Sequence, residues 1–177
     1  GRGVSYCATC DGPMFKNKEI AVGGGGDRAL EEAIFLTRYA FKVHLIHRRD
    51  ALRASAILVD KARQDPKINF VLSSTVEEIT GKDKVEGLLI KDLKTGSIRQ
   101  LIVSGVFMFV GIIPNTGFLK GLVRTDKDGF IIVDQNMRTS LEGIFSCGDC
   151  CQKTFRQVVT ACSDGATYGY ALGGHTG

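Results

Sequence analysis

Hydrophobic and polar residues in the first part of the chain follow two spacings that belong to different secondary structures. Residues 19–22 predict a short buried strand, because an apolar run follows Glu19. From Asp27 to Ala40 the apolar residues recur at helical spacing, and residues 43–47 predict a second strand. A strand, a glycine turn, a helix and a strand within about 30 residues make a βαβ unit. This order predicts a parallel sheet with a right-handed crossover.

The middle of the chain has shorter apolar runs separated by turn residues, which is typical of strands joined by tight turns. A further helix is expected at residues 53–63, before Pro66. Lys94-Thr95-Gly96-Ser97 has the composition of a hairpin turn. We therefore expect a small antiparallel meander packed on the parallel sheet. The strands are predicted at residues 68–72, 76–79, 85–91 and 99–103.

A domain boundary is predicted after the apolar run at residues 106–110, which reads as a buried strand. Gly111, Pro114 and Asn115 end this run and make the best internal boundary of the chain. The elements together predict an α/β fold. Outside the βαβ unit and the meander, we expect a loop at residues 1–17, short strands at 130–133 and 144–145, and a helix at 155–170.

Composition and charge exclude several function classes. The 177 residues carry a net charge of +4 without a basic block, so nucleic-acid binding is not indicated. No apolar run approaches the roughly 18 residues of a transmembrane helix, and we expect no membrane partner. Six cysteines are too few for a disulfide scaffold and indicate redox or metal chemistry in a reducing cytoplasm. The start at Gly1, without Met or a signal peptide, suggests a chain cut from a longer one.

The glycine-rich turn after the first strand has the spacing of a dinucleotide-binding fingerprint. Glycine is needed where the backbone turns sharply and approaches a pyrophosphate, and a small residue where the helix packs on the strand. The register G-x-G-x-x-A starting at Gly24 puts Ala29 at the small position, whereas a shift by one residue would put Arg28 there. The helix N-terminus supplies free N–H groups for phosphate. The candidate contacts are Gly24, Gly25, Gly26, Asp27, Arg28 and Ala29.

Basic residues follow the second strand, where a site for NAD would carry an acid that accepts hydrogen bonds from the ribose. A carboxylate would repel a 2′-phosphate, whereas guanidinium groups bind phosphate in a fork. His47, Arg48, Arg49 and Arg53 therefore predict a site for NADPH. The alternative is a solvated, charged turn beside an ordinary glycine-rich loop.

Cys7 and Cys10 form a C-x-x-C pair followed by Asp11. One thiol of such a pair can close onto the other, so the pair can cycle between dithiol and disulfide. Asp11 is the candidate proton relay. Half of a zinc site is the alternative, because Cys147 and Cys150 form a second C-x-x-C pair, although the two pairs lie much further apart than in common zinc ribbons.

The remaining candidate residues are expected to be structural. Cys162 is expected to be a small buried hydrophobe, whereas the sequence leaves open whether Cys150 and Cys151 are packed or exposed. His44 is expected in the core or on a face of its strand, and His175 lies in a glycine-rich tail without a nameable catalytic partner. The core is also expected to hold Phe107, Met108 and Phe109.

In chain order these motifs resemble low-molecular-weight thioredoxin reductase. The resemblance rests on residues 3–12, which contain the C-x-x-C pair, on the fingerprint at Gly24 and on His-Arg-Arg-Asp at 47–50. It covers nearly the whole chain. It continues through residues 111–116, 137–140, 143–145, 148–149 and 156–161.

The resemblance implies a two-domain flavoenzyme in which NADPH reduces FAD, FAD reduces a Cys7–Cys10 disulfide, and the dithiol reduces thioredoxin. Cys10 would face the flavin, Cys7 would react with the partner disulfide, and Asp11 would be the acid and base. Residues 1–115 would form a Rossmann-like NADPH-binding domain with the meander, and 116–177 the C-terminal part of a second, FAD-binding Rossmann-like domain. The implied FAD contacts are Gly148, Asp149, Arg156, Gln157 and Val158, and Gly111 is a further candidate cofactor contact.

The resemblance also implies a homodimer for the complete enzyme and an inactive fragment for this chain alone, because the FAD fingerprint of the family should precede residue 1. Arg28 stands where the family has a small hydroxyl residue, the cysteines of 147–151 flank Gly-Asp where small or aliphatic residues are usual, and the ending at 173–177 departs from the last helix. Two alternatives share these motifs. One is the reductase partner of a peroxiredoxin, and the other is a non-catalytic module that binds NADPH.

Overall fold

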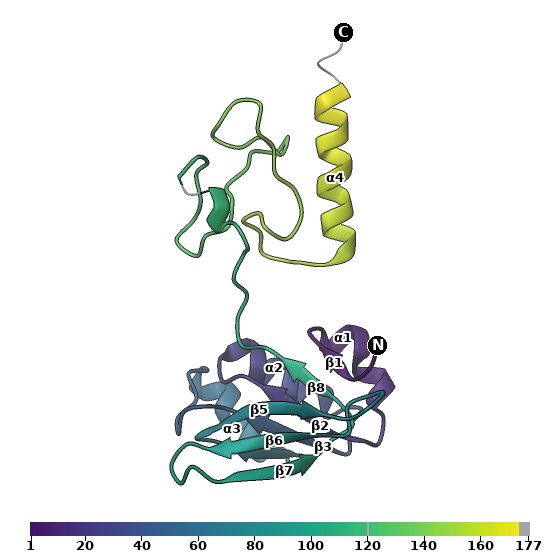
Figure 1. The fold of residues 1–177 in the computed structure, drawn as a ribbon. Helices are drawn as coiled ribbons and strands as arrows, with labels where there is room; N and C mark the ends of the chain where they lie inside the picture. Colours follow the sequence, from purple (N-terminus) through teal and green to yellow (C-terminus); the bar gives the residue numbers. More distant parts are fainter. Residues whose placement is uncertain (120, 174–177) are drawn as a thin grey trace. The chain divides into compact units, whose positions relative to one another are not determined.

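The computed structural model describes residues 1–119 and 121–173 (Figure 1). The chain divides into two compact units, and the division lies between Val110 and Gly111. His175 lies outside the described residues. Within residues 1–119 and 121–173, no helix has the length and apolar character needed to cross a membrane.

The first unit is built on a parallel sheet of five strands in the order β1-β8-β2-β3-β4. Each pair of neighbouring strands is parallel, which confirms the parallel sheet predicted from the βαβ pattern. The β2 and β3 strands are buried along nearly their whole length, as expected for a sheet covered on both faces. The strands are β1 Val4–Ser5, β2 Glu19–Gly23, β3 Lys42–Ile46, β4 Ile68–Val71 and β8 Val106–Met108.

Helices α2 (Asp27–Leu36) and α3 (Ala56–Gln64) cover one face of this sheet. Successive side chains of a strand point to opposite faces, so Ile20 and Val22 of β2 pack against the buried side of α2. The α2 helix ends at Leu36, four residues before the predicted end. The following residues close two tight turns, in which the N–H groups of Arg38 and Tyr39 bond to carbonyls three residues back.

The meander is confirmed as a separate antiparallel sheet of β5 (Ser74–Thr80), β6 (Gly87–Asp92) and β7 (Ile98–Ile102). Buried Leu88 and Ile90 of β6 pack against the face of the parallel sheet that the helices leave free. The apolar run predicted at 68–72 is β4, which pairs with β3 and belongs to the parallel sheet. The unit therefore has three layers: helices, parallel sheet and meander (Figure 1).

The expectation of a loop at residues 1–17 is wrong. This segment contains β1, the short helix α1 (Ala8–Asp11) and the 3₁₀ turn η1 (Gly12–Phe15). The partner of β1 is β8, with Val4 opposite Val106, so the strand is stabilised by a contact that is remote in sequence. Cys7 caps α1, since its sulfur accepts a hydrogen bond from the N–H of Cys10 at 3.2 Å.

The second unit contains the 3₁₀ turn η2 (Gly117–Leu119), irregular segments and helix α4 (Val158–Gly173). The strands predicted at 130–133 and 144–145 are wrong. Ile131 forms isolated bridges to Thr125 and Cys151, and Phe145 forms one to Arg138, so no ladder of successive pairs develops there. The predicted helix at 155–170 is present as α4 with later bounds.

Candidate functional site

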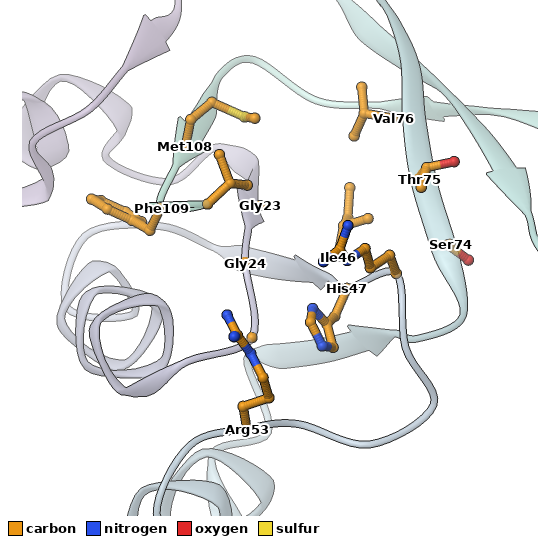
Figure 2. A pocket seen from close by; sticks show the side chains of 13 residues that line it. Gly23, Gly24, Ile46, His47, Arg53, Ser74, Thr75, Val76, Met108 and Phe109 are labelled. Atoms are coloured by element: carbon orange, nitrogen blue, oxygen red, sulfur yellow. The ribbon is translucent and has the colours of Figure 1, made fainter. Parts of the chain in front are cut away.

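A pocket of about 310 Å³ opens in the first unit at the carboxyl ends of β2, β3 and β8 (Figure 2). In open parallel sheets this edge is where ligands bind. The walls come from the glycine turn after β2, the basic segment after β3, the start of β5 and the end of β8. The lining residues are Gly23, Gly24, Gly25, Ile46, His47, Arg48, Arg53, Ser74, Thr75, Val76, Met108, Phe109 and Val110.

Gly24 occupies the position where the fingerprint needs glycine. Its φ is +147°, a backbone conformation that side chains disfavour. A Cβ placed there would lie 2.7 Å from the Cβ of Ala29 and 2.7 Å from the carbonyl oxygen of Phe109. Ala29 belongs to α2, and its side chain is fully buried in the core between this helix and the sheet. The turn, the small residue and the pocket floor therefore fit one another only without a side chain at Gly24.

Gly25 makes room for the imidazole of His47. A Cβ at Gly25 would lie 2.4 Å from Nδ1 of His47, so the ring packs directly on the glycine backbone. Gly26 differs, because no described atom outside Gly26 and its two chain neighbours lies within 4 Å of a Cβ placed there. The carbonyl of Gly25 also accepts a 2.7 Å hydrogen bond from the N–H of Arg53. The glycine turn and the basic segment are thus held together by packing and by backbone bonding.

Of the basic residues predicted to bind the 2′-phosphate, the structure brings three together at the pocket. His47, Arg48 and Arg53 line it, and Figure 2 shows His47 and Arg53 beside the glycine turn. Arg49 is exposed and is not among the described residues that line the pocket; its carbonyl accepts a hydrogen bond from the N–H of Ser73. Two guanidinium groups at one concave site favour an anionic ligand.

His47 is buried, and its Nε2 atom has no hydrogen-bond partner among the described residues. Burial lowers the pKa of His47 below its ordinary value, and the positive charges of Arg53, Arg49 and Arg48 lower it further. The imidazole is therefore held in its neutral form near pH 7. A buried nitrogen without a partner in a pocket wall is suited to a ligand that completes its hydrogen bond.

Asp27 and Arg28 have roles within the protein. The carboxylate of Asp27 accepts a 2.7 Å hydrogen bond from the N–H of Ser55, which ties the start of α2 to the segment before α3. The guanidinium of Arg28 lies 5.6 Å from the centre of the Phe109 ring, within cation–π range. Arg28 therefore packs beside the pocket wall formed by Phe109.

Sequence reasoning missed the far wall of the pocket. Ser74, Thr75 and Val76 come from the start of β5, a segment without a local signal for binding. Met108 and Phe109 were expected in the core with Phe107. Phe107 is fully buried, but Met108 and Phe109 are half-buried and line the pocket.

The Cys7–Cys10 disulfide lies in the same unit, at the start of α1, with the two Cα atoms 5.3 Å apart. Asp11 follows it, and its carboxylate accepts a 2.6 Å hydrogen bond from the hydroxyl of Ser5. Cys10 is exposed at the surface. The pair is thus accessible to a reactant and has an acidic group next to it. In this oxidised state the two sulfurs are not thiolate ligands for zinc, and the described residues contain no cluster of three or more metal-ligating side chains.

In the second unit, the expected FAD contacts surround a turn at residues 147–151. The N–H of Gly148 donates to the carboxylate of Asp164, which also pairs with Lys153. Burial alone would raise the pKa of Asp164, but the hydrogen bonds from Lys153 and Gly148 outweigh it and lower that pKa. This N–H is therefore already bonded within the protein.

The other expected FAD contacts also have partners in the second unit. Arg156 donates from Nε to the carbonyl of Asp149 and lies 3.9 Å from the centre of the Phe130 ring. Gln157 bonds to Thr160 from its N–H, and Val158 is the exposed first residue of α4. Gly111 has a φ of +108° at the start of the unit.

The structure settles where the remaining cysteines and His44 lie. Cys162 is exposed on α4, so its expected burial is wrong. Cys151 is buried, Cys150 is half-buried and Cys147 is exposed. His44 is buried on β3, where it bonds to Glu19 and Asn69, as expected for a residue of the sheet.

Known proteins match this chain over most of its length. The family model described as pyridine nucleotide-disulphide oxidoreductase matches residues 1–165. A thioredoxin reductase of Listeria monocytogenes is 52% identical over 170 residues, which cover 96% of this chain and 53% of that protein. A thioredoxin reductase of Treponema pallidum is 48% identical over 171 residues, covering 97% of this chain and 55% of that protein.

A solved structure agrees with these matches. The crystal structure of thioredoxin reductase from Streptococcus pyogenes superposes with a TM-score of 0.86 at 49% identity, covering 98% of this chain and 58% of that one. The chain spans about half the length of the curated relatives it matches. The similarity nevertheless extends through both units described above.

Proposed function

The chain belongs to the pyridine nucleotide-disulphide oxidoreductase family, and on this basis we propose that it is part of an NADPH-dependent thioredoxin reductase. Residues 1–115 would be the NADPH-binding domain with its redox-active disulfide, and 116–177 the C-terminal part of the FAD-binding domain. The observation that carries the proposal is the presence of a dinucleotide pocket and an accessible disulfide in one compact unit.

The pocket fits NADPH in its shape and its charge. The backbone of the glycine turn is open at Gly26, where a pyrophosphate could approach closely, and α2 begins directly after this residue. Arg48 and Arg53 would bind the 2′-phosphate, which distinguishes NADPH from NADH. The Nε2 atom of neutral His47, which has no hydrogen-bond partner among the described residues, would bond to a ligand atom.

The disulfide would pass electrons to thioredoxin by exchange. FAD, when bound, would supply the electron pair that opens the Cys7–Cys10 bond. Cys7 would then attack the partner disulfide as a thiolate and form a mixed disulfide with it. Cys10 would attack the Cys7 sulfur, which re-forms the Cys7–Cys10 disulfide and releases the reduced partner. Asp11, held by Ser5, would take and return the proton.

Exposed apolar side chains support the assignment of the second unit to a larger domain. On α4, Val158 is 80% exposed, Val159 71% and Tyr170 85%. Such surfaces are typical of regions that another part of a protein covers. The FAD contacts proposed at Gly148 and Asp149 would then be completed by the part of the relatives that this chain does not span. A homodimer in the cytoplasm, with thioredoxin as partner, belongs to the same proposal.

The test is a calorimetric titration of the purified chain with NADPH and with NADH, with the flavin absorbance recorded on the same sample. Binding of NADPH well above NADH supports the nucleotide site. Equal binding of both, or of neither, contradicts it. Addition of the remaining half of a related reductase should then give a yellow complex that reduces thioredoxin with NADPH, and a colourless, inactive mixture would contradict the enzyme assignment.

A further inference from the structure

A second group of cysteines lies in the turn at residues 147–151 of the second unit. The thiol of Cys151 donates to the hydroxyl of Ser146 at 3.2 Å, and that hydroxyl lies 3.3 Å from the sulfur of Cys150. The thiol of Cys150 donates in turn to the carbonyl of Cys147 at 3.3 Å. Because both thiols act as donors here, the Ser146 hydroxyl donates to the Cys150 sulfur. These hydrogen bonds run in one direction, from the Cys151 thiol to the carbonyl oxygen of Cys147.

Two backbone anchors hold this turn closed. The carbonyl of Cys150 accepts a 2.9 Å hydrogen bond from the N–H of Ile131, and Asp164 accepts the N–H of Gly148 at 2.9 Å. Within the turn, the N–H of Cys151 bonds to the carbonyl of Gly148. The Cys150 sulfur thus lies within hydrogen-bond distance of the Cys147 carbonyl, and the two cysteines have the same sequence spacing as the Cys7–Cys10 disulfide.

The three cysteines differ in their suitability for a disulfide. Cys151 is 1% exposed, and burial raises its pKa to about 11, so it stays a thiol at neutral pH. Adjacent residues such as Cys150 and Cys151 have Cα atoms about 3.8 Å apart, below the roughly 4.4–6.8 Å of ordinary disulfides. Cys147 is exposed, so an external disulfide can reach its sulfur, and Cys150 is half-buried, with its sulfur accepting a hydrogen bond from the Ser146 hydroxyl.

We propose that Cys147 and Cys150 form a second redox-active dithiol, which reacts with low-molecular-weight disulfides. This site is separate from the Cys7–Cys10 pair and does not depend on the NADPH assignment. The thiolate of Cys147 attacks one sulfur of the disulfide, forms a mixed disulfide and releases one thiolate, which takes up the proton that Cys147 lost. Cys150 then loses its proton and attacks the Cys147 sulfur, which releases the second thiol. The protein loses two electrons and two protons, and the small disulfide gains them.

The experiment uses oxidised glutathione with the full chain, first reduced and desalted, then quenched by alkylation of the remaining thiols. Trypsin places the three groups of cysteines on separate peptides: 3–16 for Cys7 and Cys10, 139–153 for the turn, and 157–177 for Cys162. We expect peptide 139–153 to lose the mass of two hydrogen atoms and to retain one alkylated cysteine without glutathione. A second cleavage before Asp149 then leaves its two pieces joined through Cys147.

Two variants identify the partner of Cys147. In Cys150→Ser the mixed disulfide cannot be resolved, so glutathione should remain on Cys147. In Cys151→Ser, the matched control, the closed disulfide should form as before. Cys162 provides an internal comparison, because this exposed thiol on α4 should keep glutathione when it reacts.

Several outcomes would overturn the proposal. Glutathione retained on Cys147 of the unsubstituted chain would show that Cys150 does not resolve it. A disulfide that still forms in Cys150→Ser but not in Cys151→Ser would show that Cys147 pairs with Cys151 and not with Cys150. If Cys147 reacts with oxidised glutathione no faster than Cys162 does, the turn has no special reactivity and the proposal is wrong. The first and third results come from the unsubstituted chain and do not depend on the folding of a variant.

Discussion

The imidazole of His47 packs on the backbone of Gly25, and a Cβ added to this glycine would fall 2.4 Å from the ring nitrogen Nδ1. The two residues belong to segments that follow β2 and β3, which are neighbours in the sheet. Their contact therefore fixes the distance between the glycine turn and the basic segment, the two parts of the proposed nucleotide site.

Gly25→Ala should destabilise the first unit through overpacking, by about 1–3 kcal/mol. If the clash is with the ring, the same substitution should cost far less in a His47→Ala background, and the coupling should reach about 0.5–3 kcal/mol. Urea unfolding of the two single variants and the double variant measures this coupling. Gly26→Ala is the control, with a cost of about 1 kcal/mol or less in either background. Equal costs of Gly25→Ala with and without His47 would show that the ring is not the obstacle.

Arg48 and Arg53 should contribute to NADPH affinity more than Arg49, which lies outside the described pocket lining. Loss of one charge-assisted hydrogen bond costs about 1.5–3 kcal/mol, so Arg48→Ala or Arg53→Ala should raise the Kd for NADPH roughly 10- to 100-fold. The Kd for NADH should hardly change in either variant, because NADH lacks the 2′-phosphate. Calorimetric titration gives the Kd of each variant for both nucleotides, and Arg49→Ala is the matched control. An effect of Arg49→Ala as large as the other two would place the phosphate elsewhere.

The stability of the first unit should fall in mild acid because of His47. Burial, followed by the charges of Arg53, Arg49 and Arg48, lowers the pKa of His47 in the folded state below its ordinary value of 6.5. The unfolded chain then binds the proton more readily, so the free energy of unfolding decreases as the pH falls below about 6.5 and down to the folded-state pKa.

Urea unfolding of the wild type and of His47→Gln at several pH values checks this dependence. The variant should lack this part of the pH dependence, because glutamine does not titrate. Curves that decline in parallel for both proteins would assign the effect to other groups.

Cys7→Ser or Cys10→Ser in the completed enzyme should abolish thioredoxin reduction while NADPH still reduces the flavin. Flavin absorbance measured beside thioredoxin turnover separates the two steps, and Cys162→Ser should leave both unchanged. Asp11→Asn should slow thioredoxin reduction by roughly 100-fold or more, the usual contribution of a general acid or base. Equal loss of both steps in the cysteine variants would contradict the proposed order of transfer.

The βαβ unit and the meander could be predicted from the sequence because their signals are local. The apolar runs of β2 and β3, the helical spacing from Asp27 and the turn at Lys94 lie within the elements they specify. The segment 1–17 could not be predicted in this way. The β1 strand has two residues, and it exists because Val4 and Ser5 pair with β8, about a hundred residues later.

The same distinction holds for the site. The glycine turn and Arg48 belong to sequence patterns, and the structure brings them to one pocket. Thr75 and Met108 line this pocket because the meander and β8 pack beside β2 and β3. This packing joins segments that are far apart in the sequence, so no local sequence pattern predicts it. Cys162 was expected to be buried because cysteine often is, but its face of α4 is uncovered in the second unit.

The pairing of β1 with β8 has a consequence for the way the proposed reaction can proceed. Cys7 lies two residues after β1, and the residues that end β8 form one wall of the nucleotide pocket. The disulfide and the pocket are thus attached to one sheet within one compact unit. A rotation of the whole unit would leave the distance between them unchanged, so in the proposed reaction each would be presented in turn to a redox group outside the unit.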